Sequence, residues 1–284
     1  MKLINSKVEI LEPTGYTIDD IYKQIEIAGR TCYKSEDKIT PTSAKEFVDR
    51  MIKSGHGAML EHGTVYLEFH VKDPSVVGEE EYHNQQAILN KLINKYSTNK
   101  YSVVKVNHYY DTAFITTNYR VLVENNWLED LKYICEPTVF HEKRISVRWT
   151  CDRGVSHEFV RHRVFSFAQE STRYCNYSKD KFGHEITYIQ PCWEMQKDEE
   201  ELFLLQLEQA QNAYNALISS GWRPQQARAI LPNALKTELV MTGFESDWKH
   251  FFELRRDAAA HPDARKLALE LYSKLYNKEY EKEK

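Results

Sequence analysis

The chain has 284 residues, 42% of them hydrophobic and 28% charged, which is the composition of an ordinary soluble protein with a sizeable core. Its 38 lysines and arginines against 42 aspartates and glutamates give a formal charge of −4, which argues against general nucleic-acid binding, since that usually requires a basic excess. No apolar run approaches membrane-spanning length, the start lacks the apolar core of a signal peptide, and the five scattered cysteines indicate reduced thiols in a cytoplasmic protein.

The first part of the chain predicts a strand, two helices and another strand. Residues 2–11 alternate enough for a strand, and Thr17 can cap a helix with apolar residues at spacings of three and four. A second helix follows Pro41 and stops near Gly55. Residues 64–71 alternate apolar and polar side chains, which predicts a half-buried strand.

Residues 72–142 are polar and rich in tyrosine, with a helix predicted at 85–96 and a strand at 101–107. We interpret this stretch as an insertion within the domain. The rest of the chain predicts further alternation of both element types: strands at 143–150, 185–189 and 235–242, a short helix capped by Asp152 or Ser156, and helices at 199–219, from Pro224 to Pro232, from Ser246 or Asp247 to Arg256, and from Pro262. With no repeat and no linker, we predict one α+β domain over 1–284, with a central, mostly antiparallel sheet flanked by helices.

The segment from residue 161 to residue 174 concentrates three arginines, a histidine, two serines, a glutamine and a glutamate. Because apolar residues alternate with these charges, we expect the segment to be partly buried. A buried arginine needs an anionic partner, and the nearby Glu158 and Glu170 are too few for three arginines. Guanidinium groups match phosphate oxygens in a bidentate way, so the segment predicts a phosphate-bearing ligand.

Two further arginines lie on predicted helices, Arg228 between apolar residues and Arg255 after FFEL. A lone arginine of this kind usually makes a structural ion pair, but beside the central segment the two favour one shared anionic site. His56 and His62 flank GAMLE, and each is more often a hydrogen-bonded structural histidine than a pocket residue. Their spacing and the absence of H-E-x-x-H predict no metal site, and no dinucleotide, Walker A or nucleophile-elbow motif is present.

Arg161-His162-Arg163, followed after seven residues by Ser171, resembles the signature of the flavin-dependent thymidylate synthases. The segments KSGHGAMLEH, QESTRY, ARAILP and FFELRRDAAAHPDAR also resemble segments of that family. The resemblance covers residues 1–71 and 143–275 and leaves 72–142 unexplained. It implies conversion of deoxyuridine monophosphate (dUMP) to thymidylate (dTMP), with FAD as cofactor, 5,10-methylenetetrahydrofolate as carbon donor and NADPH as reductant. It further implies a homotetramer whose active sites combine residues of several subunits.

The resemblance also assigns expected roles to residues of this chain. The implied nucleotide site consists of Glu158, Phe159, Val160, Arg161, Gln169, Glu170, Ser171, Thr172, Arg173, Arg228 and Arg255. The implied FAD contacts are His56, Ala58, Arg161, His162, Arg163, Gln169, Phe244, Glu245, Ser246 and His250. Arg255 is the implied catalytic residue, because it would hydrogen-bond the uracil ring and stabilise negative charge on it. Glu158 departs from the glutamine that many family members carry there.

Three other interpretations stay open at this point. Pro191-Cys192 could supply the thiol of the cysteine-dependent thymidylate synthases, although R-H-R has no place in that family. Arginines interleaved with Phe165, Phe167, Tyr174 and Tyr177 could stack on single-stranded nucleic acid. The arginines could also belong to a structural ion-pair network in an unrelated enzyme.

Overall fold

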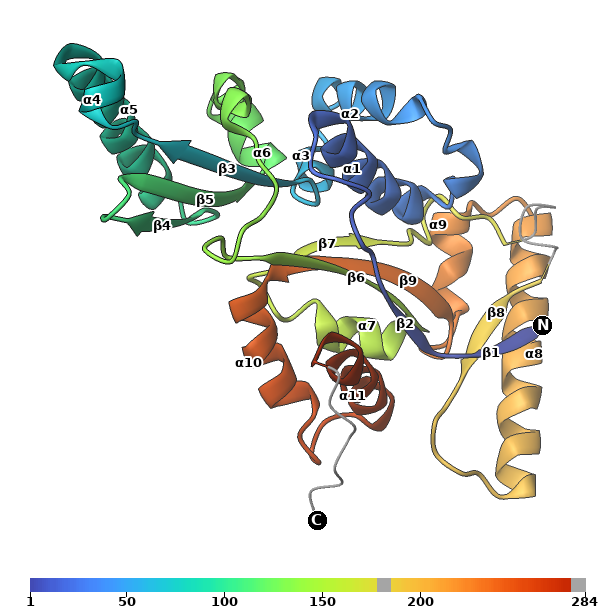
Figure 1. Ribbon diagram of the computed structural model, residues 1–284. Coiled ribbons are helices and arrows are strands. Elements are labelled where there is room, and N and C mark those ends of the chain that lie inside the picture. Colours follow the sequence, from blue (N-terminus) through green and yellow to red (C-terminus); the bar gives the residue numbers. More distant parts are fainter. Residues whose placement is uncertain (178–184, 277–284) are drawn as a thin grey trace.

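The computed structural model describes residues 1–177 and 185–276 (Figure 1). In this part of the chain the central sheet has four antiparallel strands in the order β2-β6-β9-β7. A three-stranded antiparallel sheet has the order β3-β5-β4, and β1 pairs with β8 in parallel. The strands span Lys2–Asn5 (β1), Lys7–Ile10 (β2), Thr64–His70 (β3), Val103–Asn107 (β4), Thr112–Asn118 (β5), Arg144–Asp152 (β6), Ser166–Gln169 (β7), Thr187–Gln190 (β8) and Lys236–Phe244 (β9). The predicted α+β class with a mainly antiparallel sheet is confirmed.

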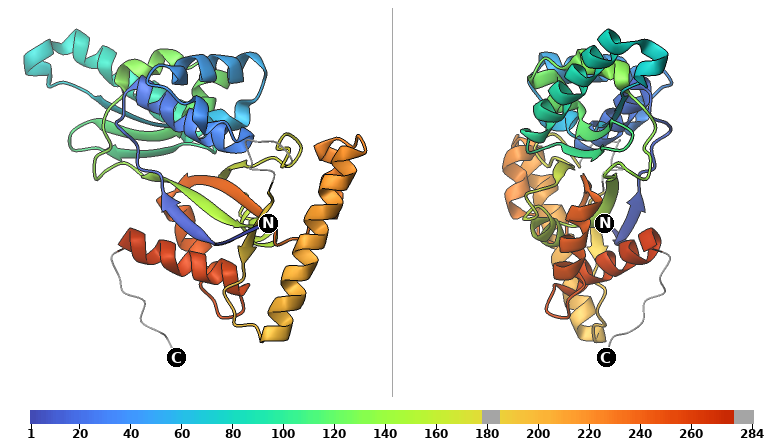
Figure 2. Two further views of the ribbon diagram at one scale, coloured as in Figure 1. Left: turned by 90° about the vertical axis from the view of Figure 1, so that its right-hand side faces the viewer. Right: turned by 60° about the vertical axis from the view of Figure 1, so that its left-hand side comes forward.

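Helices cover both faces of the central sheet (Figures 1 and 2). One face carries α1 (Ile18–Tyr33), α2 (Ser43–Lys53) and α3 (Gly57–Leu60), and the other carries α7 (Arg153–Phe159), α10 (Glu245–Arg255) and α11 (Pro262–Tyr276). The long helix α8 (Lys197–Ser219) runs beside β8, followed by α9 (Pro224–Ala227) and the 3-10 turn η4 (Arg228–Ile230). In the described ranges no helix is both long and apolar enough to cross a membrane.

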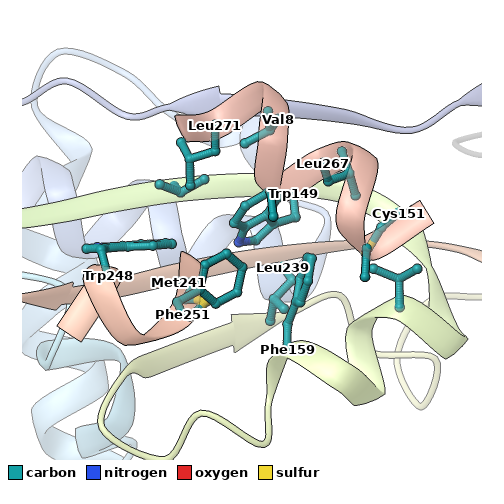
Figure 3. Packing of buried hydrophobic residues seen from close by; sticks show 14 of the residues in the cluster. Val8, Trp149, Cys151, Phe159, Leu239, Met241, Trp248, Phe251, Leu267 and Leu271 are labelled. Carbon is teal, nitrogen blue, oxygen red and sulfur yellow. The ribbon is translucent and has the colours of Figure 1, made fainter. Parts of the chain in front are cut away.

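The largest core cluster lies between the central sheet and α7, α10 and α11 (Figure 3). Alternate residues of β6 and β9 point to opposite faces, so Trp149 and Met241 face this cluster while Val240 packs toward α1. On α10 the spacing of Trp248, Phe251 and Phe252 puts all three rings on the buried side. This packing anchors α7 and α10 to the same sheet.

The stretch predicted as an insertion forms α4 (Pro74–Val77), α5 (Glu79–Ser97), β4, β5, α6 (Tyr119–Glu124) and the 3-10 helix η2 (Leu128–Tyr133). Its strands join β3, so the three-stranded sheet begins before residue 72. Leu92, Tyr96 and Ile115 share one apolar cluster with Ile21 and Phe47 from the first two helices. This stretch therefore packs against α1 and α2, and its interpretation as an insertion at 72–142 stays a prediction.

Several local expectations are confirmed and others are wrong. Thr17 caps α1 in a capping box, and Asp152 caps α7 by accepting a bond from the Val155 N–H. The strand expected at residues 2–11 is instead two strands in different sheets. The β5 and β7 strands were not predicted: β5 is buried at every position, so it carries no alternation. The helix expected from Ser246 or Asp247 begins at Glu245, after Phe244.

His62 links the end of α3 to the central sheet. It is 1% exposed, and its Nδ1 lies 2.8 Å from the Thr242 hydroxyl. Burial, followed by repulsion from the Arg144 guanidinium, lowers the His62 pKa from 6.5 to about 3. Below pH 6.5 the unfolded chain therefore binds a proton that the folded chain refuses, so the contribution of His62 to stability is complete above that pH and is lost as the pH falls toward 3.

Both proteins should lose stability between pH 7 and pH 5, as measured by urea denaturation. We expect the free energy of unfolding to fall by about 2 kcal/mol more in the unchanged protein than in His62→Gln. His83→Gln is the matched control, because the His83 side chain is 74% exposed on α5. If His62→Gln and the unchanged protein lose the same stability over this interval, the account of His62 is wrong.

Candidate functional site

The arginines of the segment 161–174 lie at the two ends of β7. Arg161 and Arg163 occupy the turns before the strand, and Arg173 occupies the turn after it. The segment is partly buried, as expected, but the buried positions lie between the arginines. All three arginines are exposed, so the premise that they are buried is wrong for the single chain. Among the described residues none of the three has a carboxylate within ion-pair distance. Three exposed cations without acidic partners are suited to binding an anionic ligand.

Arg255 is the centre of the first polar group. Its Nη1 donates to Glu158 Oε2 at 2.7 Å, its Nη2 donates to the Glu158 carbonyl at 2.6 Å, and its Nε donates to His162 Nε2 at 2.9 Å. The hydrogen bond from Arg255 is the main cause that lowers the Glu158 pKa. Burial, then the charges of Arg255 and His250, lowers the His162 pKa to about 4. His162 is thus neutral near pH 7, and its Nε2 accepts the hydrogen bond that the Arg255 Nε donates.

The core holds this group in place. Glu158 lies on α7 and Arg255 lies on α10, and the two helices meet where the Phe159 and Phe251 rings pack with centroids 5.3 Å apart (Figure 3). Phe159 is 0% exposed, so only its backbone can reach a ligand, whereas Val160 is 36% exposed. His250 is exposed on α10, with its ring 6.3 Å from that of His162.

The second polar group surrounds the loop of residues 170–174 at the other end of β7. The Ser171 N–H donates to the Cys32 carbonyl at the end of α1, at 3.0 Å. Arg228, on η4, donates from Nη1 to the Thr172 hydroxyl at 2.9 Å. Gln169 points into the protein, where its amide donates to the Ser156 and Thr237 hydroxyls at 2.8 and 3.3 Å.

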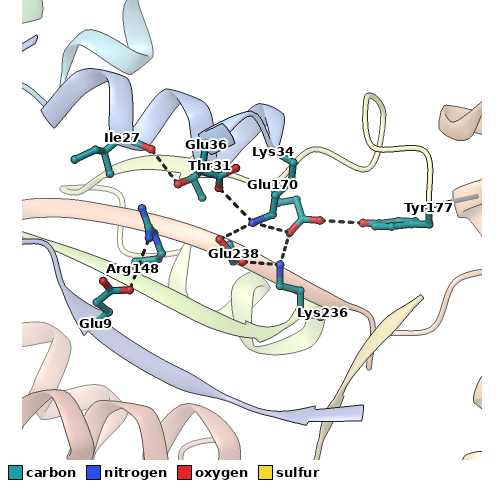
Figure 4. Close-up of polar contacts among 10 residues, drawn as sticks. All are labelled: Glu9, Ile27, Thr31, Lys34, Glu36, Arg148, Glu170, Tyr177, Lys236 and Glu238. Atoms are coloured by element: carbon teal, nitrogen blue, oxygen red, sulfur yellow. Dashed lines mark hydrogen bonds and ion pairs between the residues drawn. The ribbon is translucent and has the colours of Figure 1, made fainter. Parts of the chain in front are cut away.

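Glu170 is buried within this group, in a cluster of charges that the sequence analysis did not identify (Figure 4). The cluster contains Lys34, Glu36, Lys236 and Glu238. The K-x-E spacing at 236–238 was the available signal, because residues two apart on a strand share a face.

The remaining expected residues lie in two further places. His56 and Ala58 are exposed at α3, and the Tyr33 hydroxyl lies 3.3 Å from His56 Nδ1. The Tyr33 ring is 5.7 Å from that of Tyr174, so His56 approaches the loop of residues 170–174. The turn Phe244–Ser246 is held by Glu142, whose carboxylate accepts from the Ser246 N–H at 3.1 Å. Within the described chain, no hydrogen bond or ion pair joins this turn or the loop of residues 170–174 to the Arg255 group.

A cavity of about 490 Å³ lies between β2, β6, α1 and the segment before β6. Of the expected site residues it touches only Glu245, and its other polar walls include Asp20, Lys23, His62 and Arg144. The exposed arginines are therefore outside it. In the parts of the chain that the structure describes, no group of three histidines, cysteines or acidic residues could hold a metal ion.

Comparisons with known proteins place the chain in a family. The model of the family "Thymidylate synthase complementing protein" (Thy1) matches residues 124–278. This match contains the arginine segment, Arg228 and Arg255, and it also contains the end of the stretch predicted as an insertion. Residues 1–123, including the segment 1–71 to which the resemblance was extended, lie outside it.

Flavin-dependent thymidylate synthases are among the similar curated proteins. That of Geobacter sulfurreducens is 33% identical over 119 residues, which is 42% of this chain and 50% of the relative. That of Pyrococcus furiosus is 32% identical over 127 residues (44% and 51%), and that of Mycobacterium tuberculosis is 30% identical over 138 residues (43% and 53%). The chain thus spans about half the length of the curated relatives it matches.

Among solved structures, a UMP/dUMP methylase, PolB from Streptomyces cacaoi bound with 5-Br dUMP, aligns over 97% of this chain and 93% of its own, with 16% identity and a TM-score of 0.43. The family-model match covers more than half of the chain and includes the R-H-R and serine positions on which the resemblance was based. The chain belongs to the Thy1 family of thymidylate synthase complementing proteins.

Proposed function

We propose that the protein is a flavin-dependent thymidylate synthase, which methylates dUMP to dTMP with 5,10-methylenetetrahydrofolate as carbon donor and NADPH as reductant. The observation that carries the proposal is the arrangement around β7. Exposed arginines without acidic partners among the described residues lie at both ends of the strand, and a family-specific motif supplies them. We further propose that residues 1–284 form one domain with an insertion at about 72–142.

The nucleotide phosphate would bind at the loop of residues 170–174. Arg173 and Arg228 are exposed cations at this loop, and Ser171 offers a hydroxyl beside them. Arg228 already donates to Thr172, which keeps its guanidinium at the loop. Bidentate guanidinium contacts suit phosphate oxygens, so this end of β7 is the proposed phosphate site.

The base would bind near Arg255, with Glu158, Arg161 and the backbone of Phe159 and Val160. Arg255 would stabilise negative charge that develops on the pyrimidine, as a preorganised donor does. His162 keeps the Arg255 Nε oriented by accepting from it, and Glu158 holds the opposite edge of the guanidinium. Glu158 stands where many family members have glutamine. An ionised carboxylate has no hydrogen to donate, so Glu158 would accept a hydrogen bond from the ring N–H and donate none.

The residues present also fit FAD. Arg161 and Arg163 are exposed and lack acidic partners among the described residues, which suits a diphosphate, and Val164 beside them is 66% exposed, which suits an apolar ring system. His56, Ala58, His162, Gln169 and His250, with the turn of residues 244–246, would complete the cofactor contacts. Bound FAD would supply hydride and electron transfer. The protein itself would bind and orient the reacting molecules and exclude water from them.

A homotetramer with shared active sites would bring the separate groups together. Within one chain no hydrogen bond or ion pair among the described residues joins the Arg255 group to the loop of residues 170–174 or to the turn of residues 244–246. The exposed arginines would then face another subunit. Sharing between subunits accounts for a site whose parts point outward from one chain.

The geometry of Cys192 disfavours the cysteine-dependent alternative. Burial, followed by its hydrogen bond to Asp263, raises the Cys192 pKa to about 11. A thiol that stays protonated near pH 7 is a poor nucleophile.

An absorption spectrum of the purified protein tests the proposal. We expect flavin bands at about 375 and 450 nm that shift when dUMP is added. We also expect dTMP to form when methylenetetrahydrofolate and NADPH are supplied, measured by chromatography. A colourless protein that takes up no added FAD and binds no dUMP would overturn the proposal. Salt-sensitive binding to oligonucleotides by such a protein would favour the nucleic-acid alternative.

A further inference from the structure

Glu170 differs from its neighbours in the loop proposed for the nucleotide phosphate. Ser171 is half-buried, Arg173 and Tyr174 are exposed, and the Glu170 side chain is only 3% exposed. Its backbone N–H donates to the Glu238 carbonyl at 2.8 Å, which continues the pairing of β7 with β9. The carboxylate therefore turns into the protein at the point where the strand becomes the loop.

Three donors surround the Glu170 carboxylate (Figure 4). The Lys236 ammonium donates to Oε2 at 2.9 Å, and the Tyr177 hydroxyl donates to Oε1 at 3.3 Å. The Lys34 ammonium lies 4.0 Å from Oε2. Tyr177 follows the loop and Lys236 lies on β9, so the carboxylate joins both ends of the loop to the central sheet.

Glu238 supplies a second carboxylate that pairs with both lysines of the cluster. Its carboxylate lies 2.6 Å from both the Lys34 and the Lys236 ammonium groups. Burial alone would raise the Glu238 pKa, but the attraction and hydrogen bonds of the two lysines outweigh burial and hold the pKa at about 2. Both lysines are therefore paired with carboxylates inside the protein. Among the residues that the structure describes at this loop, Arg173 and Arg228 are exposed cations that a phosphate can reach.

Lys34 occupies an unusual backbone position to join the cluster. It ends α1 with φ 49°, in the left-handed region that favours glycine. The neighbouring Cys32 carbonyl accepts the Ser171 N–H at 3.0 Å, so the end of α1 contacts the loop through both backbone and side chain. A lysine in this conformation is consistent with a role for its ammonium group.

We propose that Glu170 is a positioning residue for nucleotide binding rather than a substrate contact. This inference rests on the proposed function. The largely buried side chains of Glu170, Lys34, Lys236 and Glu238 set the conformation of the loop of residues 170–174. With Glu170 anchored inward, the half-buried Ser171 and the exposed Arg173 follow it on the loop, where the Ser171 hydroxyl accepts from the Arg173 N–H at 3.4 Å. The loop is then already shaped for the phosphate before dUMP binds, which lowers the ordering cost of binding.

The test compares how tightly flavin-loaded variants bind dUMP. The change in flavin absorbance on adding dUMP measures the binding. We expect Glu170→Gln to raise the dUMP dissociation constant by roughly tenfold, because a neutral amide removes one of the two carboxylates that pair with the buried Lys236 and so loosens the cluster that holds the loop. FAD content and kcat at saturating dUMP should stay within about twofold, since Glu170 does not touch the reacting atoms. Glu170→Asp, which keeps the charge, should recover part of the affinity.

Two further variants separate positioning from folding. Lys34→Gly removes an ammonium group where the backbone favours glycine, so it should fold well and still weaken dUMP binding. Lys236→Met combined with Glu170→Gln should weaken binding by less than the product of the single effects, because the two residues act as one unit. Glu9→Gln is the matched control, since Glu9 lies 3.7 Å from Arg148 in a half-exposed pair away from the loop (Figure 4).

The outcomes are distinct. Unchanged dUMP affinity of folded Glu170→Gln and Lys34→Gly, even with a lower melting temperature, overturns the inference and leaves Glu170 a purely structural residue. A fall in kcat without a change in KM for dUMP also overturns it, because Glu170 would then act on the reacting group. If the unchanged protein holds flavin but does not respond to dUMP, the proposed function fails, and the inference fails with it.

Discussion

Replacing Arg255 with alanine is expected to lower the turnover of dUMP by about 10²–10³-fold, the usual cost of removing one preorganised donor to developing negative charge. Arg255 contacts Glu158 and His162 through three hydrogen bonds, so its guanidinium is oriented before any ligand arrives. Its removal should not displace the flavin, because the proposed FAD contacts lie on other residues. The measurements are kcat from dTMP formation and flavin content from absorbance.

Arg256→Ala is the control for this experiment. Arg256 is the next residue of the chain, but its guanidinium lies 3.8 Å from the centroid of the Tyr272 ring on α11, facing the core rather than Glu158. We expect it to cost stability and to leave the turnover of the folded enzyme within about threefold, as expected of a residue outside the reacting groups. Equal losses of turnover in both variants would contradict the role proposed for Arg255.

Replacing Phe251 with alanine is expected to lower the free energy of unfolding by about 3–5 kcal/mol, the range for deleting a buried aromatic side chain. Phe251 is 0% exposed. Its ring centroid lies 5.7 Å from that of Trp149, 5.3 Å from that of Phe159 and 5.0 Å from that of His162. It thus contacts the central sheet, α7 and the Arg255 group at once. Urea denaturation measures the loss.

Phe140→Ala provides the comparison, since Phe140 is 49% exposed and stacks on Phe114 at 4.9 Å outside the main core. There we expect a loss of about 1 kcal/mol or less, because one exposed aromatic pair contributes little beyond its buried area. If the two substitutions cost the same, the main core is not packed as described. A folded Phe251→Ala protein should also turn over more slowly, because α10 carries Arg255.

Motifs and local patterns predicted much of this protein. The spacing of Arg161, His162, Arg163 and Ser171 indicated the family, because those residue types at those intervals are rare by chance. Thr17 and Asp152 marked helix starts, since a capping side chain acts on backbone groups two or three residues away. The strand β5 escaped prediction because burial on all sides removes the alternation that identifies a strand.

The orientation of the site residues required the tertiary structure. Glu170 and Arg173 are three positions apart, yet one is buried among lysines and the other is exposed. Lys34, 136 positions before Glu170, became its neighbour only because α1 packs across β7 and β9. Residue types and short spacings, which act locally, determined the family and many elements from the sequence alone. Long-range packing decided which charges neutralise each other inside the protein and which remain available to a ligand.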